Sequence, residues 1–188
     1  MSGLRFPPTA SQTVGPFYAF ALTHKAELGY LCRDGFEGER IHLRLRVLDG
    51  DAAPVTDGMV EIWQADTQGR YAHPEDPRHE AADPGFCGFG RLSTHDSGVC
   101  VFDTVRPGSA GGQASHINVS IFSRGLLNHL CTRVYFAEDA LLETDPVLAL
   151  VPEDRRHTLI ARRDPGDPTQ WNLDIRLQGE NETVFFAV

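Results

Sequence analysis

The sequence has no long apolar run, and this absence limits where the chain can reside. No stretch approaches the roughly 20 consecutive apolar residues that a membrane-spanning helix requires. Residues 1–8 also lack the apolar centre of a secretory signal peptide, so we expect none. These two features exclude an integral membrane protein of the helical type and favour a protein that stays in the cytoplasm.

Basic residues are also scarce. The chain has 17 Lys and Arg against 26 Asp and Glu, which gives a formal net charge of −9. Nucleic-acid binding draws most of its affinity from a basic surface, so nucleic acid is not an expected partner. No membrane partner is expected either, since the chain has no apolar run of membrane-spanning length.

Cysteine is sparse, and no two cysteines have a metal-binding or redox spacing. The chain has four, none of them in a Cys-x-x-Cys pair. We therefore expect reduced thiols that pack as small apolar side chains in a cytosolic protein. They are Cys32, Cys87, Cys100 and Cys131.

Apolar and polar residues alternate with a period of two in several segments, and this pattern predicts half-buried β-strands. Turn-forming Asp, Gly and Pro residues separate the segments. The predicted strands cover residues 41–47, 60–63, 99–102, 116–121, 129–136 and 173–178.

One helix is predicted from Pro152 to about Arg163, because proline suits a first helical turn and basic residues suit the last. Many strands with one or two short helices predict a mainly β protein, a β-sandwich with long loops. The 188 residues and 41% hydrophobic content suit a single domain spanning 1–188. Residues 1–20 are predicted to form an extended N-terminal arm.

Strand 116–121 carries the most informative pair of residues. His116 and Asn118 are expected to point to the same side of the strand, about 6.5 Å apart. A His-x-His pair in this arrangement could bind one metal ion, whereas the neutral amide of asparagine is a poor ligand for a highly charged metal. The strand therefore resembles half of a metal site. His116 could equally be a buried histidine in a core or interface.

Three segments together carry a resemblance to a known family. They are 61–71, with Trp-Gln-Ala-Asp and a following Gly-Arg-Tyr, then 104–108, with Arg-Pro-Gly, and 173–186 at the end of the chain. In this order and spacing they resemble the intradiol ring-cleavage dioxygenases, non-haem ferric enzymes that open catechol rings. The resemblance extends over nearly the whole chain and implies a β-sandwich fold.

By that resemblance, members that hold Fe(III) use two tyrosines and two histidines. Tyr71 matches the first tyrosine and His116 the first histidine, but Asn118 stands at the second histidine position. The second tyrosine is expected just after Arg106-Pro107-Gly108, and no tyrosine occurs between Tyr71 and Tyr135. We therefore expect Tyr71, His116 and Asn118 to be vestigial positions, with no bound metal and no catalytic residue in this chain alone.

Within the family, the chain resembles the α type, an iron-free subunit that pairs with an iron-bearing β chain. Segments 11–18, 121–125, 132–136 and 178–186 carry this likeness. It implies that Fe(III) is held by the partner β subunit, and that the N-terminal arm contacts that subunit. It also implies that O₂ and the carboxylated catechol 3,4-dihydroxybenzoate react there. The implied substrate-binding residues are Arg133, Thr13, Gly15 and Pro16.

The residues themselves are compatible with these roles. The planar guanidinium of Arg133 matches a carboxylate, and it lies on the polar face of a strand. Gly15-Pro16 is a stiff turn element that can bring backbone close to a flat ring. Phe17, Phe20 and the apolar tail 185–188 predict surface that a partner covers.

Two other interpretations stay open. One is a self-contained dioxygenase with a rearranged metal site that uses Tyr71, His116 and loop histidines. The other is a non-enzymatic β-sandwich in which Trp63 and Trp171 form a stacking platform for a sugar. Both tryptophans fall in strand patterns, so we expect them to pack in or beside the core instead.

Overall fold

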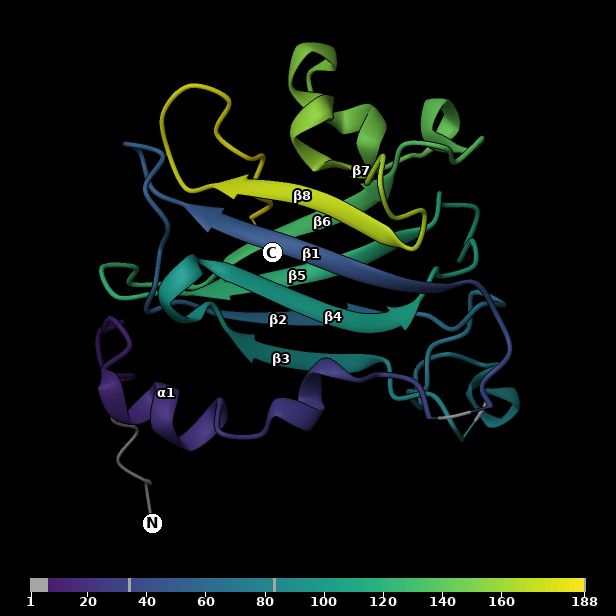
Figure 1. Ribbon diagram of the computed structural model, residues 1–188, viewed down its shortest axis with the longest axis horizontal. Coiled ribbons are helices and arrows are strands. Elements are labelled where there is room, and N and C mark those ends of the chain that lie inside the picture. Colours follow the sequence, from purple (N-terminus) through teal and green to yellow (C-terminus); the bar gives the residue numbers. More distant parts are fainter. Residues whose placement is uncertain (1–6, 34, 83, 188) are drawn as a thin grey trace.

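Eight strands form one sheet in the order β3-β2-β5-β6-β7-β8-β1-β4 (Figure 1). The computed structural model describes residues 7–33, 35–82 and 84–187. The strands are β1 (Arg40–Leu48), β2 (Met59–Gln64), β3 (Phe89–Ser93), β4 (Val99–Val105), β5 (His116–Phe122), β6 (Leu130–Phe136), β7 (Ile160–Arg163) and β8 (Gln170–Arg176).

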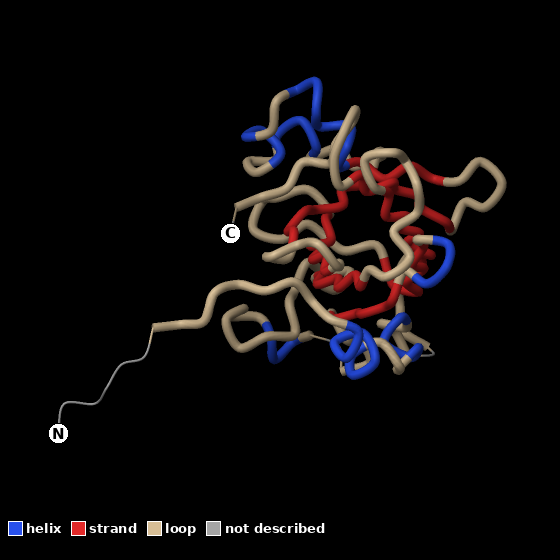
Figure 2. Tube along the Cα trace, turned by 90° about the vertical axis from the view of Figure 1, so that its left-hand side faces the viewer, coloured by secondary structure: helices blue, strands red, loops and turns tan. Residues whose placement is uncertain are grey.

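The sheet curls on itself, and the short strand β7 joins its two halves. β7 pairs with β6 in parallel and with β8 in antiparallel. At the other end of the strand order, β3 and β4 come into contact. Seen roughly along the strands, the sheet surrounds a common interior (Figure 2). The predicted class, a mainly β sandwich with long loops, is confirmed.

The period-two pattern identifies the side chains that fill this interior. Alternate residues of β1 have no exposed surface: Ile41, Leu43, Leu45 and Val47. Each of the six strands predicted from the sequence is present, as β1, β2, β4, β5, β6 and β8. Tyr135 departs from the pattern. It lies on the otherwise polar face of β6, yet it is fully buried in a second apolar cluster.

Two strands were not predicted, β3 and β7. β3 contains Gly90, whose position leaves no room for a side chain because an added Cβ would lie 2.9 Å from Leu31 and 3.0 Å from Phe102. This glycine interrupts the apolar alternation that would have identified the strand. β7 lies inside the segment that was predicted as a helix.

The prediction of one helix over 152–163 is therefore wrong in its last four residues. A 3-10 helix, η6, covers Glu153–Leu159, and β7 follows at once. A helix does begin directly after Pro152, as its start signals predicted. Ile160 and Ala161, however, pair with Tyr135 and Phe136 of β6. Tertiary pairing and burial of apolar residues thus outweigh local helix propensity here.

The N-terminal arm is also only partly extended. Residues 1–6 lie outside the described part, and residues 7–15 have no regular structure. The α-helix α1 then covers Pro16–Leu22, so the prediction of an extended arm through residue 20 is wrong from Pro16 on. Proline fits a first helical position, and the ring of Tyr18 packs against Phe122 at 5.7 Å between centroids, which anchors the helix on the sheet.

The remaining helical turns are short. The 3-10 helices besides η6 are η1 (Ala26–Gly29), η2 (His79–Ala81), η3 (His95–Ser97), η4 (Leu142–Thr144) and η5 (Leu148–Leu150). Across the described ranges, no helix has the length and apolar character to cross a membrane.

Candidate functional site

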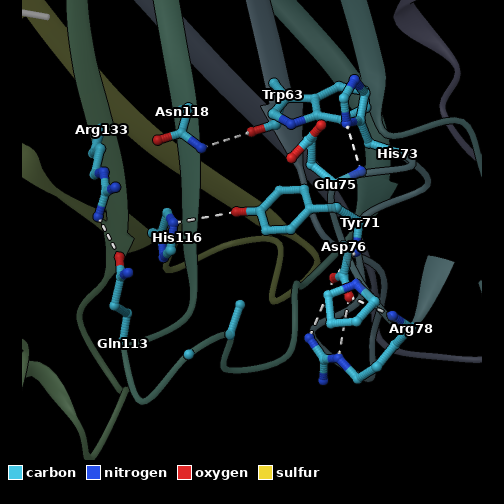
Figure 3. Close-up of a pocket in the computed structure, with 13 residues that line it drawn as sticks. Trp63, Tyr71, His73, Glu75, Asp76, Arg78, Gln113, His116, Asn118 and Arg133 are labelled. Atoms are coloured by element: carbon cyan, nitrogen blue, oxygen red, sulfur yellow. Dashed lines mark hydrogen bonds and ion pairs between the residues drawn. The ribbon is translucent and has the colours of Figure 1, made fainter.

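A pocket of about 700 Å³ brings together the three vestigial positions predicted from the sequence. Tyr71, His116 and Asn118 all line it, and Arg133 forms part of the same wall (Figure 3). Its other lining residues come from β2 and from the loops on either side: Trp63, His73, Glu75, Asp76, Pro77, Arg78, Ala110, Gly111 and Gln113.

Tyr71 is placed by a turn built around the buried carboxylate of Asp66. One oxygen of Asp66 accepts the backbone N–H groups of Gln68 and Arg70, at 2.8 and 2.9 Å. The other oxygen pairs with Nε of Arg70 at 2.8 Å. The turn leads Tyr71 back over Trp63, and the two rings stack with centroids 6.0 Å apart. The Trp-Gln-Ala-Asp motif is therefore a structural element that aims the tyrosine.

The residues after Tyr71 hold it from the other side. The backbone N–H of Tyr71 donates to Asp76 at 2.9 Å, and that of Arg78 does so at 2.8 Å. These backbone hydrogen bonds lower the pKa of Asp76 to about 2. The carboxylate is thus ionised at any ordinary pH and keeps the loop closed.

His116 points its free nitrogen at the tyrosine. Its Nδ1 lies 2.8 Å from the carbonyl oxygen of Ala114, which can only accept, so Nδ1 carries the proton. Nε2 then lies 3.4 Å from the hydroxyl of Tyr71. Burial lowers the pKa of His116 and raises that of Tyr71, so both groups are neutral near pH 7.

The loop from Arg106 to Ser115 supplies a glutamine where the resemblance called for a tyrosine. Gly108 donates its N–H to the carbonyl of Asp66 at 2.9 Å, and the hydroxyl of Ser109 donates to the carbonyl of Gln113 at 2.6 Å. The Gln113 side chain accepts a hydrogen bond from Nη1 of Arg133 at 2.6 Å. Sequence reasoning missed Gln113, although it is the one long polar side chain between Ser109 and Ala114.

This donor set does not fit a ferric ion. Asn118 donates its amide to the carbonyl of Trp63 at 3.4 Å, and the oxygen of Gln113 is engaged by the guanidinium of Arg133. Neutral amides replace two anionic or imidazole ligands, and a fixed positive charge lines the pocket, which disfavours a trivalent cation. Among the described residues, no group of three or more His, Cys, Asp or Glu side chains could hold a metal ion.

The four predicted substrate-binding residues do not come together within one chain. The hydroxyl of Thr13 accepts the backbone N–H of Gly125, in the loop between β5 and β6. The carbonyl of Gly15 accepts the N–H of Tyr18 at 3.0 Å, and Pro16 begins α1. No arm residue of the described part lines the pocket of Arg133.

The two tryptophans lie in different surroundings. Trp63 is half-buried in the pocket wall, whereas Trp171 is fully buried, with the guanidinium of Arg163 4.4 Å from its ring centre. The hypothesis of a sugar-stacking platform made by both is therefore wrong. The expectation that they pack in or beside the core is confirmed for Trp171, whereas Trp63 lines the pocket.

The two loops that flank the pocket pack so closely that a glycine is required between them. Gly69 has φ +70°, and an added Cβ would clash with the backbone carbonyl of Ser109. We expect Gly69→Ala to lower the free energy of unfolding by about 3 kcal/mol, from steric overlap added to left-handed strain. Gly111→Ala is the matched control, because its φ is +59° with open space around it. It should cost about 1 kcal/mol. Equal losses in urea denaturation would contradict the close packing.

Comparison with known proteins places this geometry in a family. A family profile described as "Dioxygenase" matches residues 13–179. The chain belongs to this family of intradiol dioxygenases. Enzymes of this dioxygenase family depend in general on Fe(III).

Named relatives include both kinds of subunit. The chain is 43% identical over 195 positions to "Protocatechuate 3,4-dioxygenase alpha chain" of Burkholderia cepacia, covering 96% of this chain and 97% of that protein. It is 36% identical to "Protocatechuate 3,4-dioxygenase beta chain" of the same organism, over 78% of this chain and 67% of that one.

A solved dioxygenase structure has the same fold. The dioxygenase domain of a dioxygenase–carbohydrate-binding protein fusion from Streptomyces sp. SirexAA-E superposes with a TM-score of 0.63 at 23% identity. The match covers 95% of this chain and 96% of that one.

Proposed function

We propose that this chain is the iron-free α subunit of a protocatechuate 3,4-dioxygenase. The α/β assembly uses O₂ to cleave the ring of 3,4-dihydroxybenzoate between its hydroxylated carbons, giving 3-carboxy-cis,cis-muconate in the catabolism of aromatic compounds. The observation that carries this proposal is a family pocket with an incomplete ligand set. Tyr71 and His116 still meet, but Asn118 and Gln113 offer only amides.

An incomplete ligand set calls for a partner that holds the iron. The likeness to both an alpha and a beta chain supports a hetero-oligomer of related subunits. We place Fe(III) on the β subunit, and give this chain the roles of lining the substrate pocket and recognising the substrate. The few cysteines of this chain, none in a Cys-x-x-Cys pair, favour the reducing, cytoplasmic setting that we propose for it.

The substrate contacts of this chain are assigned to four residues. Arg133 is half-buried and forms no ion pair with any acidic group in the described ranges, so its charge is available for a substrate carboxylate. Thr13, Gly15 and Pro16 belong to the N-terminal arm or to the start of α1. None of the three lines the pocket of this chain. That separation favours a role for the arm at a neighbouring subunit.

The exposed apolar residues of α1 support an interface at the same end of the chain. Phe17 is 84% exposed and Phe20 is 72% exposed, which is costly unless a partner covers them. The apolar tail contributes less than its sequence indicates. Phe185 and Phe186 are half-buried against this chain's own core clusters, and Phe186 pairs with Cys131 of β6; Val188 lies outside the described residues.

A self-contained dioxygenase remains the second candidate, and metal content separates the two. Purified alone, the chain should contain no stoichiometric iron, show no visible tyrosinate-to-iron absorption, and leave 3,4-dihydroxybenzoate intact. Co-expressed with a β-type chain that carries two tyrosines and His-x-His, it should co-purify as an iron-containing, active complex. Stoichiometric iron with ring cleavage by this chain alone would reject the proposal.

A further inference from the structure

One nitrogen of the Arg133 guanidinium forms hydrogen bonds within this chain, and the other two are available to a ligand. Its Nη1 donates to Oε1 of Gln113 at 2.6 Å and lies 3.4 Å from the hydroxyl of Tyr135. Within the described residues, Nε and Nη2 have no hydrogen-bond partner. These two nitrogens form the side-on fork that matches the two oxygens of a carboxylate.

Both anchors of Arg133 are themselves fixed. The Gln113 backbone is tied to Ala110 and to the hydroxyl of Ser109. Tyr135 is fully buried, and its hydroxyl donates to Oδ1 of Asp145 at 3.2 Å. A guanidinium with immobilised anchors loses less conformational freedom when it binds a ligand.

Asp145 in turn is locked into the loop beneath the pocket. It has no exposed surface, and it accepts the backbone N–H groups of Ala114, Val147 and Leu148 at 2.7 to 2.9 Å. The chain of contacts from Asp145 through Tyr135 to Arg133 therefore rests on backbone. It fixes the direction in which the guanidinium points.

The anchors hold Arg133 without cancelling its charge. Gln113 is a neutral amide, and burial raises the pKa of Tyr135 to about 12, so its hydroxyl stays protonated. The nearest acid in this series of contacts, Asp145, is separated from the guanidinium by that hydroxyl. A glutamate at position 113 would instead form an ion pair with Arg133 and neutralise the charge of its guanidinium.

We propose that Gln113 and Tyr135 are positioning residues that turn Arg133 into a selective anchor for aromatic carboxylates. They fix one nitrogen of the guanidinium through neutral groups and leave its Nε–Nη2 edge for the substrate. Selectivity for an aromatic acid over an uncharged catechol follows, since only the acid can use this edge. The inference rests on the proposed function, because the carboxylate is that of the substrate at the β subunit's iron.

The test compares Gln113→Glu, Gln113→Leu and Arg133→Ala in the assembled α/β enzyme, on 3,4-dihydroxybenzoate and on catechol. Gln113→Glu should raise KM for the acid roughly tenfold, the worth of one charge-assisted hydrogen bond, with kcat nearly unchanged. Gln113→Leu should raise it less, by a few-fold. Catechol kinetics should stay within about twofold in both variants. Gln178→Glu adds the same charge at an exposed site away from the pocket and should leave both substrates unaffected.

Repeating the Gln113 variants in an Arg133→Ala background shows whether Gln113 acts through Arg133. The proposal requires that Gln113→Glu cause no further loss there. The same loss in both backgrounds, or equal losses on both substrates, overturns it. If Arg133→Ala alone impairs the two substrates equally, the carboxylate-anchor part of the proposed function fails first, which separates the two failures.

Discussion

Replacing Arg133 with alanine is expected to lower kcat/KM for 3,4-dihydroxybenzoate by roughly ten- to a hundredfold in the assembled α/β enzyme. A hydrogen bond to a charged group contributes about 1.5–3 kcal/mol, and 1.4 kcal/mol is a factor of ten. Arg133 is half-buried with no acidic partner in the described part of the chain, so its removal leaves no other charge uncompensated. Steady-state kinetics on the acid and on catechol measure the effect.

The loss should be confined to the substrate that carries the carboxylate. Catechol never uses the contact, so its kcat/KM should change by less than about threefold. The iron content should stay the same, because Arg133 is not a ligand in the proposal. Arg124→Ala is the matched control, since Arg124 is 82% exposed and pairs with exposed Asp57. Equal losses on acid and catechol would reject the anchor role.

Replacing Asp66 with alanine should lower the free energy of unfolding by about 3–5 kcal/mol, the usual cost of breaking a buried ion pair from one side. The substitution removes the acceptor of two backbone N–H groups and of Nε of Arg70, at a site with no exposed surface. The turn that carries Tyr71 should loosen as well. Urea denaturation of the purified protein measures the loss.

Asp57→Ala provides the comparison for Asp66. Its carboxylate is 44% exposed and pairs with Arg124 at 2.9 Å, so its loss should change stability by less than about 1 kcal/mol. If Asp66→Ala were as mild as Asp57→Ala, the turn would be held by packing and not by the buried carboxylate.

The fold was predictable wherever a strand has one buried face. β1 and β5 alternate so regularly that their inward residues can be read from the sequence, and all of them are buried. β3 was not predicted, because Gly90 stands where the alternation would require an apolar side chain, at a position too crowded for one. β7 was not predicted either, because it depends on a long-range pairing with β6. The local sequence after Pro152 indicates a helix and carries no sign of that pairing.

The candidate site was predictable for residues that share a strand or a motif. Tyr71, His116 and Asn118 were predicted as positions of one former metal site, and all three line the same pocket. Gln113 was not foreseen, because its contact with Arg133 joins a loop to a strand 20 residues away. The helical form of the arm after Gly15 was also missed, since the docking of Tyr18 on Phe122 depends on the assembled sheet.

The unequal placement of the two tryptophans gives the protein a pair of built-in optical probes. Trp171 is fully buried in the core, and its indole N–H has no hydrogen-bond partner among the residues that the structure describes. Its fluorescence should therefore be blue-shifted and should report only on global unfolding. Trp63 lies in the pocket wall beside Tyr71, where its emission should respond to whatever enters. The chain contains no other tryptophan. Trp63→Phe therefore leaves a single-tryptophan protein, and the difference between its tryptophan emission and that of the parent isolates the pocket.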